Sequence, residues 1–349
     1  MKHGGDYIGY FNKYGIMPID YSENTSPFGI PEGVKSAICD SLEEASRYPD
    51  PLCRNLKTAL ARYHKVEEDY IICGNGAADI IFKLSLALKP KKAVVTAPTF
   101  SEYEEALSLS GCKVRHHILK AEKNFEITED ILNDIKDDLD VIFICQPNNP
   151  TGKICDRDLL NRILNKCNEK EILLVIDECF LDFIRDGESS ISKLKDYENL
   201  FILKAYTKLY AMAGVRLGYG LTSNKKLLEE ISKSGQPWSV SIMAQAAGIA
   251  ALREYDYVEK VVKNTEDESK YLKAELKRLG IKYYDSKANY ILMYSNDYEF
   301  DSKMEEKGFL IRNCSNYIGL DVGYYRISVK KHEDNARLIK AMGEILNVR

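Results

Sequence analysis

The sequence predicts an α/β protein in which helices cover a mostly parallel central sheet, followed by a smaller α+β lobe. From about Pro31 to Val240, short and nearly continuous apolar runs alternate with amphipathic helical stretches, a pattern typical of strands buried on both faces of a parallel sheet. After about Ala246 the pattern changes to pairs of strand-like runs between charged helical segments, which favours a small sheet with helices on one side. A length of 349 residues is enough for two such lobes.

The elements can be assigned in order. The predicted strands of the large lobe are the apolar runs at 91–97, 140–147, 171–177, 199–205 and 215–220. Residues 74–88 predict a turn followed by a helix, and 156–167 predict an amphipathic helix. In the small lobe we expect a helix at about 255–279, strands in IKYYDS, ANYILMYS, GFLIRN and YYRISVK, and a last helix from His332. Residues 1–30, rich in Gly, Tyr and Pro, predict an extended arm that packs on the small lobe or on a partner subunit. We therefore expect a large domain at 31–245 and a small domain made of 1–30 and 246–349.

Composition argues against several classes of partner. A net charge of −4 without a Lys/Arg-rich block gives no reason to expect a nucleic acid. No apolar run could cross a bilayer, and residues 1–20 lack the apolar centre of a signal peptide, so we expect a cytoplasmic protein without a membrane partner. Nine cysteines without a CxxC pair predict reduced thiols and no metal site.

Two turns that follow predicted strands carry residues suited to a ligand. In open α/β sheets ligands bind outside the carboxyl ends of the strands. GNGAAD at 74–79 places Gly76, Ala77 and Ala78 at a helix start, where backbone N–H groups can hold a phosphate, although a plain turn would have the same composition. Asp79 breaks the GxGxxG pattern of dinucleotide-binding proteins. QPNNPTG at 146–152 presents the amide of Asn149 from a tight turn.

Charged residues follow two further strands. Asp177 ends an apolar run, where a carboxylate is costly unless it meets a positive partner such as a protonated ring nitrogen. Lys208 lies among small and apolar residues, and Arg216 follows eight positions later. The ordinary role of such a lysine is a solvated surface charge. Its neighbours favour an amine that forms a covalent bond, with a guanidinium placed for a phosphate.

These features together describe pyridoxal 5'-phosphate, a ligand with a phosphate, a basic ring nitrogen and a carbonyl that captures an amine. The PNNPTG turn, Asp177 at a strand end, Lys208 and Arg216 resemble the motifs of the fold-type I pyridoxal-phosphate-dependent family, in its class I/II aminotransferase branch. The likeness covers nearly the whole chain.

The resemblance implies a role for each matched residue. Lys208 would bind the cofactor covalently and then move protons at the substrate α-carbon, and Asp177 would keep the ring nitrogen protonated. The other cofactor contacts would come from Asn149 at the ring hydroxyl, from Arg216, Thr207, Gly76, Ala77 and Ala78 at the phosphate, and from Phe100 or Tyr103 stacked on the ring, with Phe100 slightly favoured. Tyr48 in RYPDP would reach the phosphate of the other subunit, which implies a homodimer. Arg326 would bind the substrate carboxylate.

Two positions depart from the family pattern. Phe180 stands where many members have a tyrosine that supports the cofactor hydroxyl, and Ala205 stands where a hydroxyl residue is common. Neither change removes the cofactor site. The phenylalanine weakens the interpretation as a simple transaminase.

Two subgroups of the family are similar to this chain. RYPDP and the PNNPTG context resemble histidinol-phosphate aminotransferases. HGGD at 3–6, NTSPFG at 24–29, DECFLDF, QPWSVS at 236–241 and the run at 311–329 resemble the threonine-phosphate decarboxylases of cobalamin biosynthesis. The second resemblance implies decarboxylation of L-threonine O-3-phosphate, a small phosphorylated amino acid, to (R)-1-amino-2-propanol O-2-phosphate, with serine phosphate as an open alternative.

The substrate anchors follow from the second resemblance. Arg312, Asn316 and His3 would hold the substrate phosphate, and Asn149 and Arg326 would contact the rest of the amino acid. The alternative activity is a histidinol-phosphate-type aminotransferase that uses 2-oxoglutarate. A nicotinamide dehydrogenase is disfavoured by the broken glycine pattern, and a cofactor-binding regulator by the lack of length for a DNA-binding head.

Overall fold

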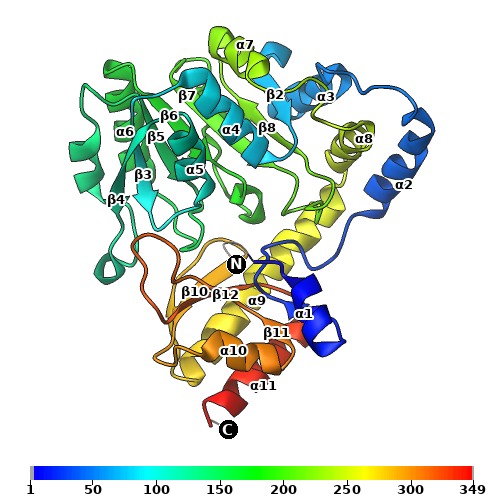
Figure 1. The fold of residues 1–349 in the computed structure, drawn as a ribbon, viewed down its shortest axis with the longest axis vertical. Helices are drawn as coiled ribbons and strands as arrows, with labels where there is room; N and C mark the ends of the chain where they lie inside the picture. Colours follow the sequence, from blue (N-terminus) through cyan, green and yellow to red (C-terminus); the bar gives the residue numbers. More distant parts are fainter. Residues whose placement is uncertain (1–3, 348–349) are drawn as a thin grey trace.

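A seven-stranded sheet forms the centre of the larger lobe in the computed structural model, which describes residues 4–347 (Figure 1). Its strand order is β2-β8-β7-β6-β5-β3-β4, and β8 runs against the other six strands. The strands are β2 (Ile71–Gly74), β3 (Lys92–Ala97), β4 (Lys113–Ile118), β5 (Val141–Cys145), β6 (Leu173–Asp177), β7 (Leu200–Ala205) and β8 (Gly218–Leu221). Every residue of β5 and β6 is buried, because helices cover both faces of the sheet.

Two helical layers supply the apolar side chains that cover this sheet. One face packs against α4 (Ala77–Leu88), α5 (Glu102–Leu109) and α7 (Lys225–Lys233). The other packs against α3 (Arg54–His64), α6 (Arg157–Glu169) and α8 (Ile242–Ala251), with α2 (Glu32–Ser41) lying on α8. This architecture confirms the predicted α/β class with a mostly parallel sheet.

The smaller lobe is built on a four-stranded antiparallel sheet in the order β12-β13-β10-β9. Its strands are β9 (Lys282–Tyr284), β10 (Tyr290–Tyr294), β12 (Arg312–Asn313) and β13 (Tyr324–Ser328), and its helices are α9 (Tyr255–Arg278), α10 (Phe300–Glu306) and α11 (His332–Ile345). Helix α9 links the lobes, because Val261 lies in the core of the large lobe while Leu272 and Leu276 lie in that of the small one.

The N-terminal arm packs on the small lobe, but it is not extended throughout. Strand β1 (Ile19–Asp20) pairs in parallel with β11 (Phe309–Leu310). Before it, the chain forms helix α1 (Tyr7–Tyr14), which corrects the expectation of an extended arm. The Asp6 side chain accepts a hydrogen bond from the Gly9 N–H at 3.0 Å, and Gly15 ends the helix with a φ of 70°. A capped start and a left-handed end stabilise a short helix that the composition alone did not indicate.

The predicted domain boundary between residues 245 and 246 falls inside α8. Ala244 and Ala247, on either side of it, are both buried in the same core. We therefore propose that the passage to the small lobe lies at α9. No helix within residues 4–347 combines the length and the apolar character that crossing a membrane requires.

Candidate active site

A cavity of about 250 Å³ opens at the edge of the large sheet where the carboxyl ends of β3, β5, β6 and β7 meet. This is the edge at which open α/β sheets bind ligands. The small lobe and the arm close the other side of the cavity. Eleven of the residues predicted from the sequence line it: Ala77, Ala78, Phe100, Tyr103, Asn149, Asp177, Thr207, Lys208, Arg216, Arg312 and Arg326.

Asp177 is a buried carboxylate at the end of β6, with a relative exposure of 5%. Its Oδ2 accepts a hydrogen bond from the Tyr103 hydroxyl at 2.5 Å, and its Oδ1 accepts one from the Cys179 N–H at 2.9 Å. Among residues 4–347, no lysine, arginine or histidine forms an ion pair with it. A positive partner stabilises a buried carboxylate, and a protonated ring nitrogen in this cavity would be such a partner.

Lys208 lies half-buried in the wall of the same cavity. Burial is the main cause that lowers the pKa of its amine, and the positive charges of Arg326 and Arg216 act in the same direction, while Glu23 opposes them. The Lys208 carbonyl accepts a hydrogen bond from the Ser26 N–H at 2.9 Å, which ties this loop to the arm. A lowered pKa raises the neutral, nucleophilic fraction of the amine, as covalent capture of an aldehyde requires.

The start of α4 forms a cup for an anion. Gly76 caps the helix with a φ of 88°, and a Cβ added there would stand 2.6 Å from Arg216 Nη2. A Cβ added at Gly218 would stand 2.4 Å from the backbone nitrogen of Ala77. The first N–H groups of a helix have no partner within the helix, and here a guanidinium lies beside them. This combination of helix start, arginine and absent side chains fits a phosphate group.

Two buried arginines lie opposite each other on adjacent strands of the small sheet. Arg312 in β12 and Arg326 in β13 are directly paired, with exposures of 7% and 5%. The Arg326 Nη1 donates to Asn149 Oδ1 and its Nη2 to the Ser22 carbonyl at 2.6 Å, while the buried Nε has no hydrogen-bond partner among the described residues. The Arg312 Nη2 donates to Asn316 Oδ1 at 2.7 Å. Like charges opposite each other destabilise a sheet, so this pair favours a ligand that carries more than one negative charge.

The two aromatic candidates differ in how they are held. The Tyr103 ring is fully buried, stacks on Phe143 with 5.1 Å between ring centroids, and donates its hydroxyl hydrogen to Asp177. Phe100 is half-buried and meets the Tyr103 ring edge-on at 5.6 Å. The Phe100 ring is therefore the better placed of the two to lie over a bound heterocycle. Phe180 also lines the cavity, and its ring packs edge-on against Tyr290 at 5.0 Å.

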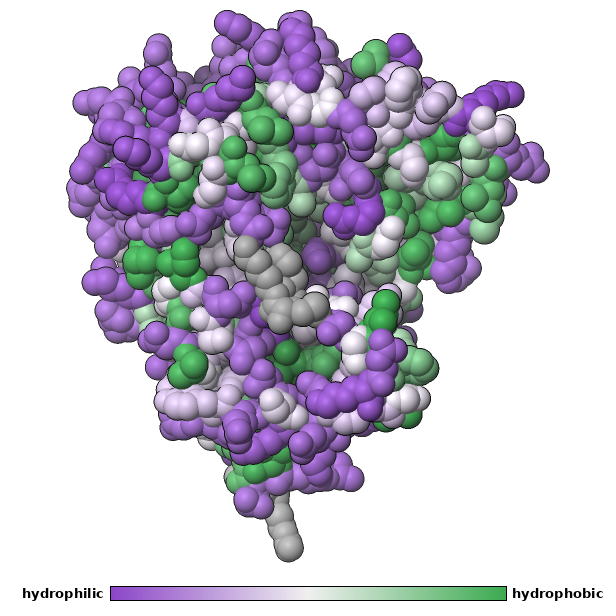
Figure 2. Space-filling model, viewed as in Figure 1, coloured by the Kyte–Doolittle hydropathy of each residue, from purple (hydrophilic) through white to green (hydrophobic). Residues whose placement is uncertain are grey.

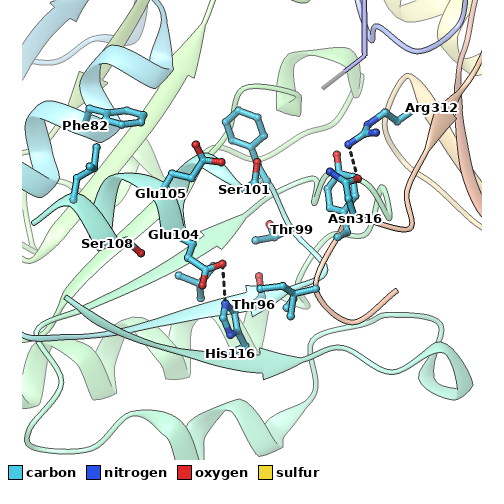
Figure 3. Close-up of a pocket in the computed structure, with 16 residues that line it drawn as sticks. Phe82, Thr96, Thr99, Ser101, Glu104, Glu105, Ser108, His116, Arg312 and Asn316 are labelled. Atoms are coloured by element: carbon cyan, nitrogen blue, oxygen red, sulfur yellow. Dashed lines mark hydrogen bonds and ion pairs between the residues drawn. The ribbon is translucent and has the colours of Figure 1, made fainter. Parts of the chain in front are cut away.

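A second cavity, of about 550 Å³, adjoins the first (Figure 3). The two share Phe100, Arg312 and Tyr317 as lining residues. Asn316 lines the second cavity and not the first. On the opposite side, Figure 3 shows Glu104 of α5 directed toward His116 of β4, which it meets in an ion pair at 3.3 Å. The space beside Arg312 is thus larger than a small amino acid needs.

The remaining predicted residues lie elsewhere. Tyr48 is 79% exposed, outside both cavities, and its ring lies 4.7 Å from that of Trp238. Leu42 and Leu52 are also exposed nearby in the chain, and hydrophobic side chains show on the surface around α2 (green in Figure 2). His3 lies outside the described residues.

From the arm, only His3 was predicted from the sequence as a site residue, and the structure adds others. Ser22, Glu23 and Asn24 all line the cavity. Asn24 is 3% exposed, and its Oδ1 has no hydrogen-bond partner within residues 4–347. The signals in the sequence were HGGD at 3–6, whose Gly4 lines the cavity, and NTSPFG, which begins at Asn24.

Comparisons with known proteins agree with this geometry. The chain matches the family described as aminotransferase class I and II over residues 17–342. It is 36% identical to the threonine-phosphate decarboxylase of Salmonella typhimurium, over 99% of this chain and 96% of that protein. It is 32% identical to the histidinol-phosphate aminotransferase of Methanosphaera stadtmanae, over 96% of this chain and 93% of that one. The crystal structure of the histidinol-phosphate aminotransferase from Clostridium acetobutylicum superposes with a TM-score of 0.89 at 31% identity, over 94% of this chain and 99% of that chain.

Proposed function

Because this chain belongs to the aminotransferase class I and II family, whose cofactor is pyridoxal 5'-phosphate, we propose that it decarboxylates L-threonine O-3-phosphate to (R)-1-amino-2-propanol O-2-phosphate. The bond from the α-carbon to the carboxylate breaks, CO2 leaves, and a proton takes its place on the α-carbon. The product is the amino-alcohol phosphate used in cobalamin biosynthesis.

Different residues of the first cavity would contact different parts of the cofactor. Lys208 would bind its aldehyde, and Asp177 would hold its ring nitrogen as a cation. Arg216, Thr207 and the N–H groups of Ala77 and Ala78 would hold its phosphate beside Gly76, and Phe100 would cover its ring. Asn149 accepts from Arg326 through Oδ1, which leaves its N–H groups to donate to the ring hydroxyl. When bound, the cofactor supplies an electron sink for the α-carbon bond that stands perpendicular to its ring.

The paired arginines are the observation that carries the substrate class. Threonine phosphate presents a carboxylate and a phosphate, and two buried guanidinium groups lie side by side to receive them. In this proposal Arg326, next to Asn149, binds the carboxylate, and Arg312 with Asn316 binds the phosphate. Holding both anions fixes the amino acid so that the carboxylate, rather than the α-hydrogen, is the group that leaves. Lys208 then returns a proton to the α-carbon.

A homodimer is part of the same proposal. Tyr48 is exposed and lines neither cavity, its ring lies beside the exposed Trp238, and Leu42 and Leu52, near it in the sequence, are exposed as well. A second copy that covered this surface would bury apolar area and could bring Tyr48 to the phosphate in the partner's cavity.

A histidinol-phosphate-type aminotransferase is the second candidate. The second cavity of about 550 Å³ leaves room beside Arg312 for a substrate longer than threonine phosphate. The relatives that carry that name match nearly the whole chain. This reaction would need 2-oxoglutarate and would release no CO2.

The deciding experiment is incubation of the loaded enzyme with threonine phosphate in the absence of any keto acid. We expect sustained release of CO2 with formation of the amino-alcohol phosphate. Turnover that begins only when 2-oxoglutarate is added, with histidinol phosphate as amino donor, would select the aminotransferase. Serine phosphate in the same assay shows whether the threonine methyl group matters.

Arginine variants test how the substrate is held. Arg312→Gln should lower kcat/KM for threonine phosphate by at least about tenfold, as expected for losing a charge-assisted hydrogen bond of about 1.5–3 kcal/mol. It should leave turnover of threonine without phosphate unchanged, whereas Arg326→Gln should impair both substrates. Arg337→Gln, an exposed arginine of α11, is the control. An Arg312 variant that keeps the preference for the phosphorylated substrate would remove the proposed phosphate anchor.

A further inference from the structure

Tyr103, the buried tyrosine of α5, is hydrogen-bonded to Asp177. Tyr103 lies in the first turn of that helix with 0% exposure, and its ring is fixed between Phe143, stacked at 5.1 Å, and Phe100, edge-on at 5.6 Å. Its hydroxyl lies 2.5 Å from Asp177 Oδ2. Packing on two sides of the ring holds the hydroxyl toward the carboxylate.

The direction of this hydrogen bond is fixed by chemistry. Burial is the main cause that raises the pKa of the Tyr103 hydroxyl, and the negative charge of Asp177 raises it further. The hydroxyl therefore keeps its proton and acts as the donor, while Asp177 acts as the acceptor. Burial also raises the pKa of the thiols of Cys145 and Cys179 beside it, so neither competes as a charged group.

We propose that Tyr103 is a positioning residue that keeps Asp177 in its charged form, so that the shared proton stays on the ring nitrogen of the bound cofactor. The inference rests on the proposed cofactor site and holds for decarboxylation and transamination alike. A charge-assisted hydrogen bond stabilises a carboxylate relative to its protonated form. Without the Tyr103 hydroxyl, Asp177 loses the donor at Oδ2 and keeps the Cys179 N–H at Oδ1, so the proton would move toward Asp177. The ring then loses its positive charge.

The test compares wild-type protein with Tyr103→Phe, both loaded with cofactor labelled with nitrogen-15 in the ring. Nitrogen-15 NMR reports how much of the ring nitrogen is protonated. We expect the proton distribution to shift toward Asp177 by about 10- to 100-fold in Tyr103→Phe, and cofactor affinity to fall by a similar factor. The kcat should fall while KM changes little, because the substrate anchors are untouched.

Tyr325→Phe is the matched control. Tyr325 is also fully buried, and its hydroxyl donates to the Asp297 carbonyl at 3.1 Å in the small lobe. We expect this variant to lose stability without any change in the ring nitrogen. A Tyr103→Phe protein with the wild-type proton distribution and cofactor affinity would overturn the proposal.

A second variant, Tyr103→His, keeps the test possible if Tyr103→Phe does not fold. Tyr103→His keeps an N–H donor toward Asp177, so its ring nitrogen should stay protonated; a folded Tyr103→His protein that loses this proton would also overturn the inference. Lys208→Ala separates this outcome from failure of the cofactor site. If Lys208→Ala keeps the absorbance of the lysine-bound cofactor, the site itself is wrong, whatever Tyr103 does.

Discussion

The most direct test of the phosphate cup is Gly218→Ala. A methyl group at this position in β8 would stand 2.4 Å from the Ala77 nitrogen, 2.6 Å from the Gly76 carbonyl carbon and 3.0 Å from the Ala77 Cα. Ordinary contacts between carbon atoms are about 3.5–4.0 Å. All three neighbours are backbone atoms that cannot rotate away, so the start of α4 must move by about 1 Å.

Two consequences can be given a magnitude. Overpacking of this kind costs about 1–3 kcal/mol of stability. The Ala77 N–H is also a proposed phosphate donor, and a hydrogen bond to a charged group represents about 1.5–3 kcal/mol. Moving that donor should weaken binding of pyridoxal 5'-phosphate by about 10- to 100-fold.

The assay is an absorbance titration of the apoprotein with pyridoxal 5'-phosphate and, separately, with pyridoxal, which lacks the phosphate. Gly218→Ala should weaken the first much more than the second. Gly214→Ala is the control, because an added Cβ there meets no heavy atom within 4 Å. Equal affinity for pyridoxal 5'-phosphate in the two variants would refute the assignment of the cup.

Two further predictions concern buried charges. Lys208 attacks an aldehyde only in its neutral form, and burial, followed by the charge of Arg326, lowers the pKa of its amine. Capture of the cofactor should therefore reach its plateau at a lower pH than it would with an exposed lysine, and Arg326→Leu should move the midpoint of this pH dependence upward. A midpoint that stopped-flow absorbance finds unchanged in Arg326→Leu would contradict the role of the Arg326 charge. Lys204, 2% exposed, lies 2.8 Å from Asp182 and 3.7 Å from the fully buried Glu178. Lys204→Met leaves the Glu178 carboxylate without its cation and should lower the free energy of unfolding, measured in urea, by about 3–5 kcal/mol. A decrease below about 1 kcal/mol would show that the ion pair contributes little to stability.

The polar residues at the strand ends could be predicted because their signal is local. Asp177 directly follows a continuous apolar run, and Lys208 follows another. Once such runs are assigned to parallel strands, their carboxyl ends must meet at one edge of the sheet. The cavity at that edge contains both residues, and no knowledge of packing was needed to place them together.

Contacts between distant segments could not be predicted from the sequence in this way. Tyr103 and Asp177 are 74 positions apart, Asn149 and Arg326 are 177 apart, and Ser22 and Arg326 are 304 apart. Nothing in the spacing of the sequence indicates which hydroxyl meets the carboxylate. The arm was likewise predicted without its helix and without the contribution of Ser22, Glu23 and Asn24 to the cavity, because its position depends on β1 pairing with β11.

The amino-acid sequence by itself determined the order of strands and helices and which chemical groups stand at the strand ends, since both follow from the periodicity of neighbouring residues. The tertiary structure alone decided that two arginines face each other, that the arm lines the cavity, and that the Tyr103 hydroxyl meets Asp177. These outcomes depend on sheet register and on side-chain packing between distant parts of the chain, where a shift of one residue would turn a side chain to the opposite face.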